Sequence, residues 1–83
     1  MKGEIKMDES GFAAMGKPIS GHRRSAAYDL CVEFGLKNED GWDAVGKVAN
    51  ALERDKPYEA MELGRKYLDL TGTYRLMSVL LTA

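Results

Sequence analysis

The stretch that decides the fold is residues 20–36, which read SGHRRSAAYDLCVEFGL. Its apolar residues recur at positions i, i+3, i+4 and i+7, a spacing that places them on one side of a helix. These residues are Ala27, Leu30, Cys31 and Phe34. Ser20 can cap the first turn, and Gly35 stands where a helix end favours a left-handed residue. The stretch therefore predicts an amphipathic helix from about Ser20 to Phe34 with a sharp end.

Two more helices are predicted downstream by the same kind of pattern. The second begins near Asn38 or Asp40 and has apolar residues at helical spacing. They are Trp42, Val45, Ala49 and Leu52. The third begins at Asp55 or Lys56, where Asp55 can cap and Pro57 suits the first turn. Its apolar side is formed by Ala60, Met61, Gly64, Tyr67 and Leu68. Because glycine is costly inside a helix, Gly46 and Gly64 predict a close approach between helices.

The remaining sequence leaves one alternative open, at residues 71–73, Thr-Gly-Thr. The glycine favours a break or kink there, followed by a fourth helix. Small and apolar residues at a spacing of four would also fit one helix that continues to the C-terminus. The final segment, 74–83, is apolar on more than one face, which is typical of a central core helix or of half of an interface.

These patterns predict the fold class as all-α. The chain has 83 residues, of which 45% are hydrophobic and 30% charged, and this is the composition of one small globular domain. We expect a compact bundle of three to four short antiparallel helices over residues 20–83 and an irregular N-terminal arm over residues 1–19. A domain this small buries a limited core, so association with a partner would add substantially to its stability.

Composition argues against catalysis, metal binding and membrane insertion. The single cysteine, Cys31, and the single histidine, His22, are nine residues apart on one helix, about 13 Å along its axis. We therefore expect no catalytic residues, no metal site and no cofactor. The net charge of −1 gives no overall attraction to nucleic acid or anionic lipid. The N-terminus lacks an apolar signal segment, and the longest uncharged apolar stretch, 76–83, is too short to span a bilayer, so we expect a cytoplasmic protein.

Trp42-Asp-Ala-Val45-Gly46 resembles the opening of a tetratricopeptide repeat, whose pattern begins W-x2-L-G. The stretch 58–70, YEAMELGRKYLDL, is similar to the second helix of that repeat. The resemblance covers one helical hairpin, about residues 42–72. It implies a helical scaffold that binds segments of other proteins.

Charge is unevenly distributed along the chain. Residues 29–43 carry five acidic side chains and one basic one, a net charge of −4, which favours a partner steered by electrostatics. Basic residues gather near the start of the first helix, where the N-terminal N–H groups of a helix can hold an anion. This possible anion contact comprises Lys17, His22, Arg23 and Arg24.

The main functional hypothesis is a small non-catalytic protein–protein interaction module, such as an adaptor, a chaperone-like subunit or an inhibitor of a larger protein. Aromatic residues and methionine are favoured at interface centres, and the final segment has more apolar surface than three short helices readily cover. We therefore expect a protein partner or a homo-oligomer to contact four residues. They are Tyr74, Met77, Leu81 and Trp42.

Two alternatives belong to other functional classes. Residues 69–78 resemble the turn and second helix of a helix-turn-helix, which would make the chain a small DNA-binding regulator. The single basic residue of that helix, Arg75, weighs against binding in a DNA groove. The other alternative is an oligomer that binds a phosphate-containing ligand near Arg23 and Arg24.

Overall fold

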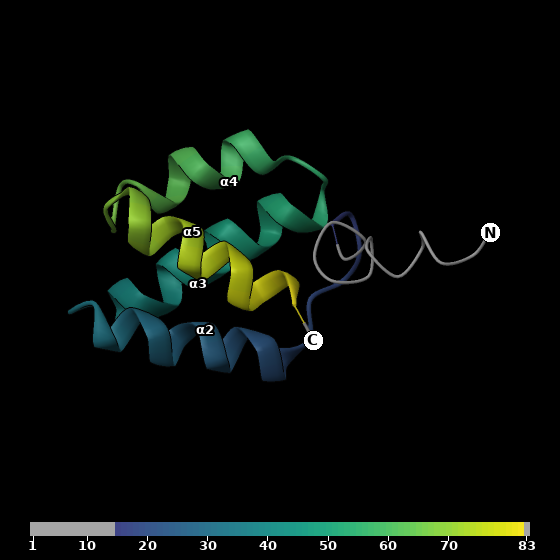
Figure 1. Ribbon diagram of the computed structural model, residues 1–83. Helices are drawn as coiled ribbons and strands as arrows, with labels where there is room; N and C mark the ends of the chain where they lie inside the picture. The colour runs from purple at the N-terminus through teal and green to yellow at the C-terminus, as the bar shows by residue number, and fades with distance from the viewer. Residues whose placement is uncertain (1–14, 83) are drawn as a thin grey trace.

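The computed structural model describes residues 15–82, which form an all-α bundle of four helices (Figure 1). The helices are α2 (Gly21–Glu33), α3 (Asn38–Glu53), α4 (Pro57–Gly64) and α5 (Leu70–Leu81). Consecutive helices run in opposite directions, and α2 also packs against α5. No helix in this part of the chain is long and apolar enough to cross a membrane.

The start and the end of α2 confirm the prediction for residues 20–34. The Ser20 hydroxyl accepts a hydrogen bond from the Arg23 N–H at 3.2 Å. At the other end Gly35 is left-handed, with φ +100°, and the Leu36 N–H returns to the Cys31 carbonyl at 2.8 Å. This is a Schellman end, which satisfies carbonyls that the helix leaves unpaired.

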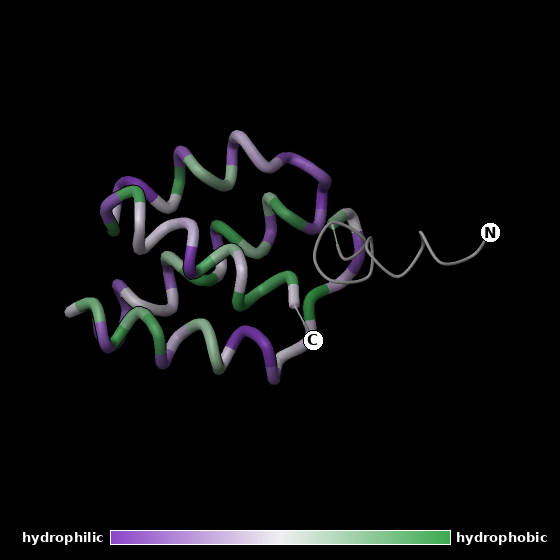
Figure 2. Tube along the Cα trace, viewed as in Figure 1, coloured by the Kyte–Doolittle hydropathy of each residue, from purple (hydrophilic) through white to green (hydrophobic). Residues whose placement is uncertain are grey.

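Helix α3 also ends in a Schellman motif, but the left-handed residue there is not a glycine. Asp55 adopts φ +60°, and the Lys56 N–H bonds the Ala51 carbonyl at 3.0 Å. Asp55 therefore terminates α3, and the prediction that it caps the next helix is wrong. Pro57 is the first residue of α4, as its missing N–H favours. The connection is hydrophilic along its length in Figure 2.

The chain does break between the third and fourth helices, but at residues 65–69 and not at Thr71-Gly72-Thr73. Because α4 ends at Gly64 and α5 begins at Leu70, residues 65–69 of the stretch 58–70 are not helical. Asp69 is the N-cap of α5, and its carboxylate accepts from the Gly72 N–H at 2.7 Å. The Thr73 hydroxyl donates to the Asp69 carbonyl at 2.8 Å. The capping signal of Asp69 outweighs that of Thr73, so the Thr-Gly-Thr sequence lies inside the helix.

Another helix comes close to the backbone at Gly64 but not at Gly46. A Cβ at Gly64 would lie 2.7 Å from the Thr73 methyl group and 3.3 Å from a methyl group of Val48. This confirms the close approach predicted there. A Cβ at Gly46 would meet nothing within 4 Å, so the prediction of a tight crossing at Gly46 is wrong.

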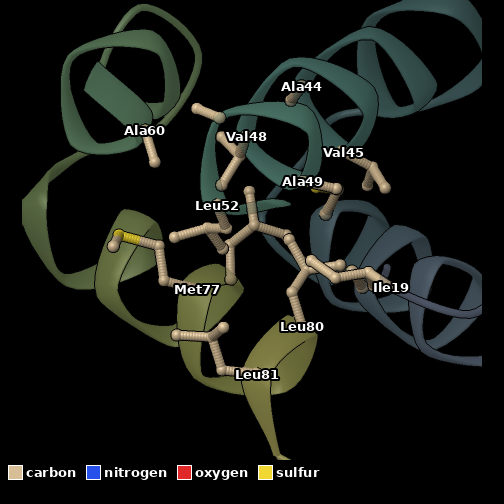
Figure 3. Close-up of a cluster of buried hydrophobic side chains, with 14 of the residues drawn as sticks. Ile19, Ala44, Val45, Val48, Ala49, Leu52, Ala60, Met77, Leu80 and Leu81 are labelled. Atoms are coloured by element: carbon tan, nitrogen blue, oxygen red, sulfur yellow. The ribbon is translucent and has the colours of Figure 1, made fainter. Parts of the chain in front are cut away.

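The core is formed by side chains from all four helices together with Ile19 (Figure 3). Its largest fully buried aliphatic side chains are Leu52, Leu76, Leu80, Val45 and Val48. Met77 and Leu81 also belong to it, with 9% and 8% of their surface exposed. The expectation that Met77 and Leu81 form a partner surface is therefore wrong. The reason is that α5 packs against α2, α3 and α4, which together cover more than one of its faces.

The described part of the N-terminal arm, residues 15–20, is irregular, as expected, but is bound to the bundle. The Gly16 N–H donates to the Leu52 carbonyl at 2.9 Å, and Ile19 is buried at the end of the core. The Ile19 N–H donates to the Glu53 carboxylate at 2.6 Å. These contacts fix the direction in which the chain enters α2. Residues 1–14 of the predicted arm lie outside the described residues.

Candidate functional site

Trp42 lies on the surface, with 47% of its area exposed. Its ring stacks on that of Tyr28, from the neighbouring helix α2, with the centroids 4.4 Å apart and the planes 8° from parallel. Stacking restricts the rotation of the indole even though half of it contacts solvent. Of the two sequence-based interpretations of Trp42, core residue or partner contact, its exposure favours the second.

Tyr28 holds this position because the first turn of α3 leaves room for its ring. A Cβ at Gly41 would lie 2.8 Å from the Tyr28 ring, so only glycine admits the ring in this place. The Tyr28 hydroxyl accepts a hydrogen bond from the Asn38 N–H at 2.9 Å, at the start of α3. Tyr28 is therefore held by packing and by a hydrogen bond, and it supports Trp42 in turn.

We call the surface around Tyr28, Val32, Trp42 and Gly46 the Trp42 surface. Val32 is exposed and follows Tyr28 by one turn of α2, while Gly46 follows Trp42 by one turn of α3. Because Gly46 carries no side chain and has open space above it, the surface beside the indole is unobstructed.

Five acidic residues lie within residues 29–43, the segment that precedes and includes Trp42, and all five are exposed. They are Asp29, Glu33, Glu39, Asp40 and Asp43. With Lys37, the segment 29–43 keeps the net charge of −4 that its composition gives. Asp43 also contacts Lys47 at 3.7 Å and accepts from the Tyr67 hydroxyl at 3.1 Å. Three of these residues, Glu39, Asp40 and Asp43, come from the same helix as Trp42. An aromatic residue with acidic residues nearby is a suitable contact for a cationic apolar partner.

Tyr74, the other predicted contact residue on the surface, lies on a different side of the molecule. It has 55% of its area exposed and lines a groove of about 440 Å³ between α2 and α5. We call this the α2–α5 groove. Its lining residues are Leu30, Glu33, Tyr74, Arg75, Ser78 and Val79. Tyr74 and Trp42 therefore belong to two surfaces on either side of α2, not to one.

Of the four residues of the predicted anion contact, two are exposed and two contact other parts of the bundle. Lys17 and His22 are exposed. Arg24 pairs with Glu53 at 3.1 Å and donates to the Ile19 carbonyl at 3.2 Å, and the Arg23 guanidinium reaches the Leu80 carbonyl at 3.5 Å. Both arginines thus contact other parts of the bundle, which leaves less of their charge for an external phosphate.

Cys31 and His22 occupy different environments on α2. Cys31 is fully buried, and burial raises the pKa of its thiol, so the neutral form is favoured. His22 is exposed in the first turn of the helix. Among residues 15–82, no group of three or more histidine, cysteine, aspartate and glutamate side chains is arranged to hold a metal ion.

The helix that the helix-turn-helix hypothesis would place in DNA is α5. The exposed positions of its first two turns are Leu70, Thr71, Tyr74 and Arg75. Only one of these is basic, and the N-cap Asp69 adds a negative charge at the end that would approach the bases.

Two features of these surfaces were not predicted from the sequence. Tyr28 lies beside the apolar stripe of α2, and its contact with Trp42 depends on how α2 and α3 pack. The placement of Glu33 and Arg75 along one groove depends likewise on α2 packing against α5. Comparison with known proteins finds no matching family model, no matching curated protein and no matching solved structure.

Proposed function

We propose that the chain is a protein–protein interaction module whose Trp42 surface binds a basic, apolar segment of a larger protein. The observation that carries this proposal is the exposed Trp42 ring held parallel to Tyr28. Tryptophan is enriched among residues that dominate binding energy, and a side chain already fixed in place loses little entropy on binding. The resemblance of residues 42–72 to a tetratricopeptide-repeat hairpin points to the same class of function.

The charge around Trp42 indicates the chemistry of the partner segment. A guanidinium or ammonium group over an indole is stabilised by the ring quadrupole, and nearby carboxylates add to the attraction. The net charge of −4 over residues 29–43 would also disfavour an acidic partner. We therefore expect the bound segment to carry arginine or lysine beside an aliphatic or aromatic residue.

A selection from a random peptide library, followed by titration of synthetic peptides, tests this proposal. Trp42 is the sole tryptophan of the chain, so its fluorescence reports directly on occupancy of the surface. We expect the selected peptides to be basic and apolar, and their affinity to fall as salt is raised. Selection of acidic or uncharged peptides would contradict the partner chemistry.

Two variants and one control locate the binding surface. Trp42→Ala should weaken peptide binding by about tenfold or more, as expected for a central aromatic contact. Gly41→Ala should weaken it as well, because the added Cβ displaces the Tyr28 ring while Trp42 is retained. Tyr58→Ala removes another exposed aromatic residue, in the first turn of α4, and should leave binding unchanged. Because Trp42→Ala lacks the sole tryptophan, binding by all four proteins is compared by isothermal titration calorimetry. Equal binding by wild type and Trp42→Ala would refute the proposal.

A further inference from the structure

The α2–α5 groove carries one acidic and one basic side chain on opposite helices. Glu33 comes from α2, and Arg75 comes from α5. Each of the ion pairs within residues 15–82 involves other residues: Arg24 with Glu53, Lys47 with Asp43, and Arg54 with Glu59. Glu33 and Arg75 are both exposed, so both are available to a second molecule.

Apolar surface lies between and beside these two charges. Leu30 and Val79 are half-buried in the groove, and Tyr74 is exposed at its edge. Phe34, also exposed, continues the apolar side of α2 one turn beyond Leu30, and its ring lies over Gly72 of α5. An apolar centre with a charged rim is the composition of a protein interface.

The pattern of the groove is complementary to itself. Helices α2 and α5 lie side by side and antiparallel (Figure 1). A two-fold axis that runs along the groove between them, parallel to both, would place α2 of each copy on α5 of the other. Glu33 of each copy would then face Arg75 of the other, and the apolar side chains would meet near the axis. We propose that a second copy of this chain binds in the α2–α5 groove and forms a two-fold dimer with two Glu33–Arg75 ion pairs.

Self-association fits this groove and not the Trp42 surface. Two copies joined through the Trp42 surface would bring the acidic first half of α3, with Glu39, Asp40 and Asp43, close to its counterpart, which like charges disfavour. The groove instead offers one charge of each sign. The dimer goes beyond the binding role proposed for Trp42 and leaves both Trp42 surfaces available.

Charge reversal tests the dimer and its axis together. Sedimentation velocity over a range of protein concentrations should show reversible dimerisation of the wild type. Glu33→Arg and Arg75→Glu alone should each weaken dimerisation by about tenfold or more, because like charges then face each other. An equimolar mixture of the two variants should dimerise again, since every facing pair is once more of opposite sign. Glu39→Arg, the same charge change on α3, serves as the matched control and should dimerise at least as well as the wild type.

Each other outcome overturns the proposal. A wild type that stays monomeric over the whole range shows that the groove does not bind a second copy. Single variants that dimerise like the wild type, or a mixture that fails to associate, show that Glu33 does not face Arg75. If a reversed charge unfolds the chain, Glu33→Gln and Arg75→Gln provide the same test with a smaller expected loss. Peptide binding by the Trp42 surface is measured separately, so failure of one proposal leaves the other standing.

Discussion

The backbone N–H of Ile19 and the carboxylate of Glu53 are joined by a 2.6 Å hydrogen bond across 34 residues of sequence. The same carboxylate oxygen accepts from the Arg24 guanidinium at 3.1 Å. One side chain at the end of α3 therefore fixes both the arm and the first turn of α2. Because Ile19 is buried, this contact also positions part of the core.

Glu53 should make stability depend on pH in the acidic range. The Ile19 N–H, and to a lesser degree Arg24, lower the pKa of Glu53 against the opposing effect of burial. A lowered folded-state pKa contributes stability above the unfolded pKa, and this is lost as pH falls through the folded value. We expect Glu53→Gln to reduce the free energy of unfolding by about 1 kcal/mol at pH 7. This difference should shrink as pH falls below the ordinary glutamate pKa of about 4.3 and the carboxylate of Glu53 becomes protonated. Urea denaturation followed by circular dichroism measures it, and a constant difference would contradict the role of the charge.

The two Schellman ends predict opposite effects of glycine substitutions. Asp55→Gly should stabilise the chain by about 0.5–1 kcal/mol, because glycine adopts a positive φ without a Cβ penalty. Gly35→Ala should destabilise it by about 1–2 kcal/mol through the backbone alone, since an added Cβ meets nothing within 4 Å. Thermal unfolding of both variants checks the signs, and a destabilised Asp55→Gly would mean that the aspartate side chain has a role of its own.

Alanine should destabilise the chain at position 64 and stabilise it at position 46. Gly64→Ala forces a Cβ against Thr73 and should cost about 1–3 kcal/mol. Adding Thr73→Ser removes the methyl group but keeps the hydroxyl that bonds Asp69, so the double variant should recover part of the loss. Gly46→Ala has open space and should gain up to about 1 kcal/mol from helix propensity. Chemical denaturation of the three variants is sufficient, and equal effects at both glycines would contradict the packing described.

Leu81 should tolerate no charge, in contrast to an exposed position on the same helix. Leu81→Asp places a carboxylate in the core, and we expect the chain to lose its cooperative unfolding transition. Thr71→Asp adds the same charge on the exposed side of the first turn of α5 and should change stability by no more than about 0.5 kcal/mol. Circular dichroism of both variants distinguishes a core residue from a surface contact. A folded Leu81→Asp variant would restore Leu81 as an interface candidate.

The parts of the fold that the sequence predicts well depend on local chemistry. Ser20 and Gly35 bound α2 because caps and left-handed ends act within a few residues of the backbone groups that they satisfy. The sequence does not determine the start of α5, because Asp69 and Thr73 are both good caps. The packing of Gly64 against Thr73 fits a helix that begins after Asp69.

The parts that the sequence misses depend on contacts between distant elements. Periodicity shows that the last helix is apolar on several faces but not that three neighbouring helices cover Met77 and Leu81. Likewise, helical spacing places Trp42 on the stripe of α3, whereas in the structure its ring is exposed and stacks on Tyr28, from the neighbouring helix. Candidate surfaces were therefore predicted in part, as residue types but not as assembled groups.

The packing of α2 against α5 has a consequence for how fast the chain folds. Hairpins of neighbouring helices close short loops and form quickly, whereas bringing α2 to α5 requires closing a loop that contains all of α3 and α4. Docking of α5 is therefore expected to be the slow step. Until it occurs, the apolar side of α2 around Cys31 stays open to water and to other unfolded chains, so conditions that slow this step should favour aggregation.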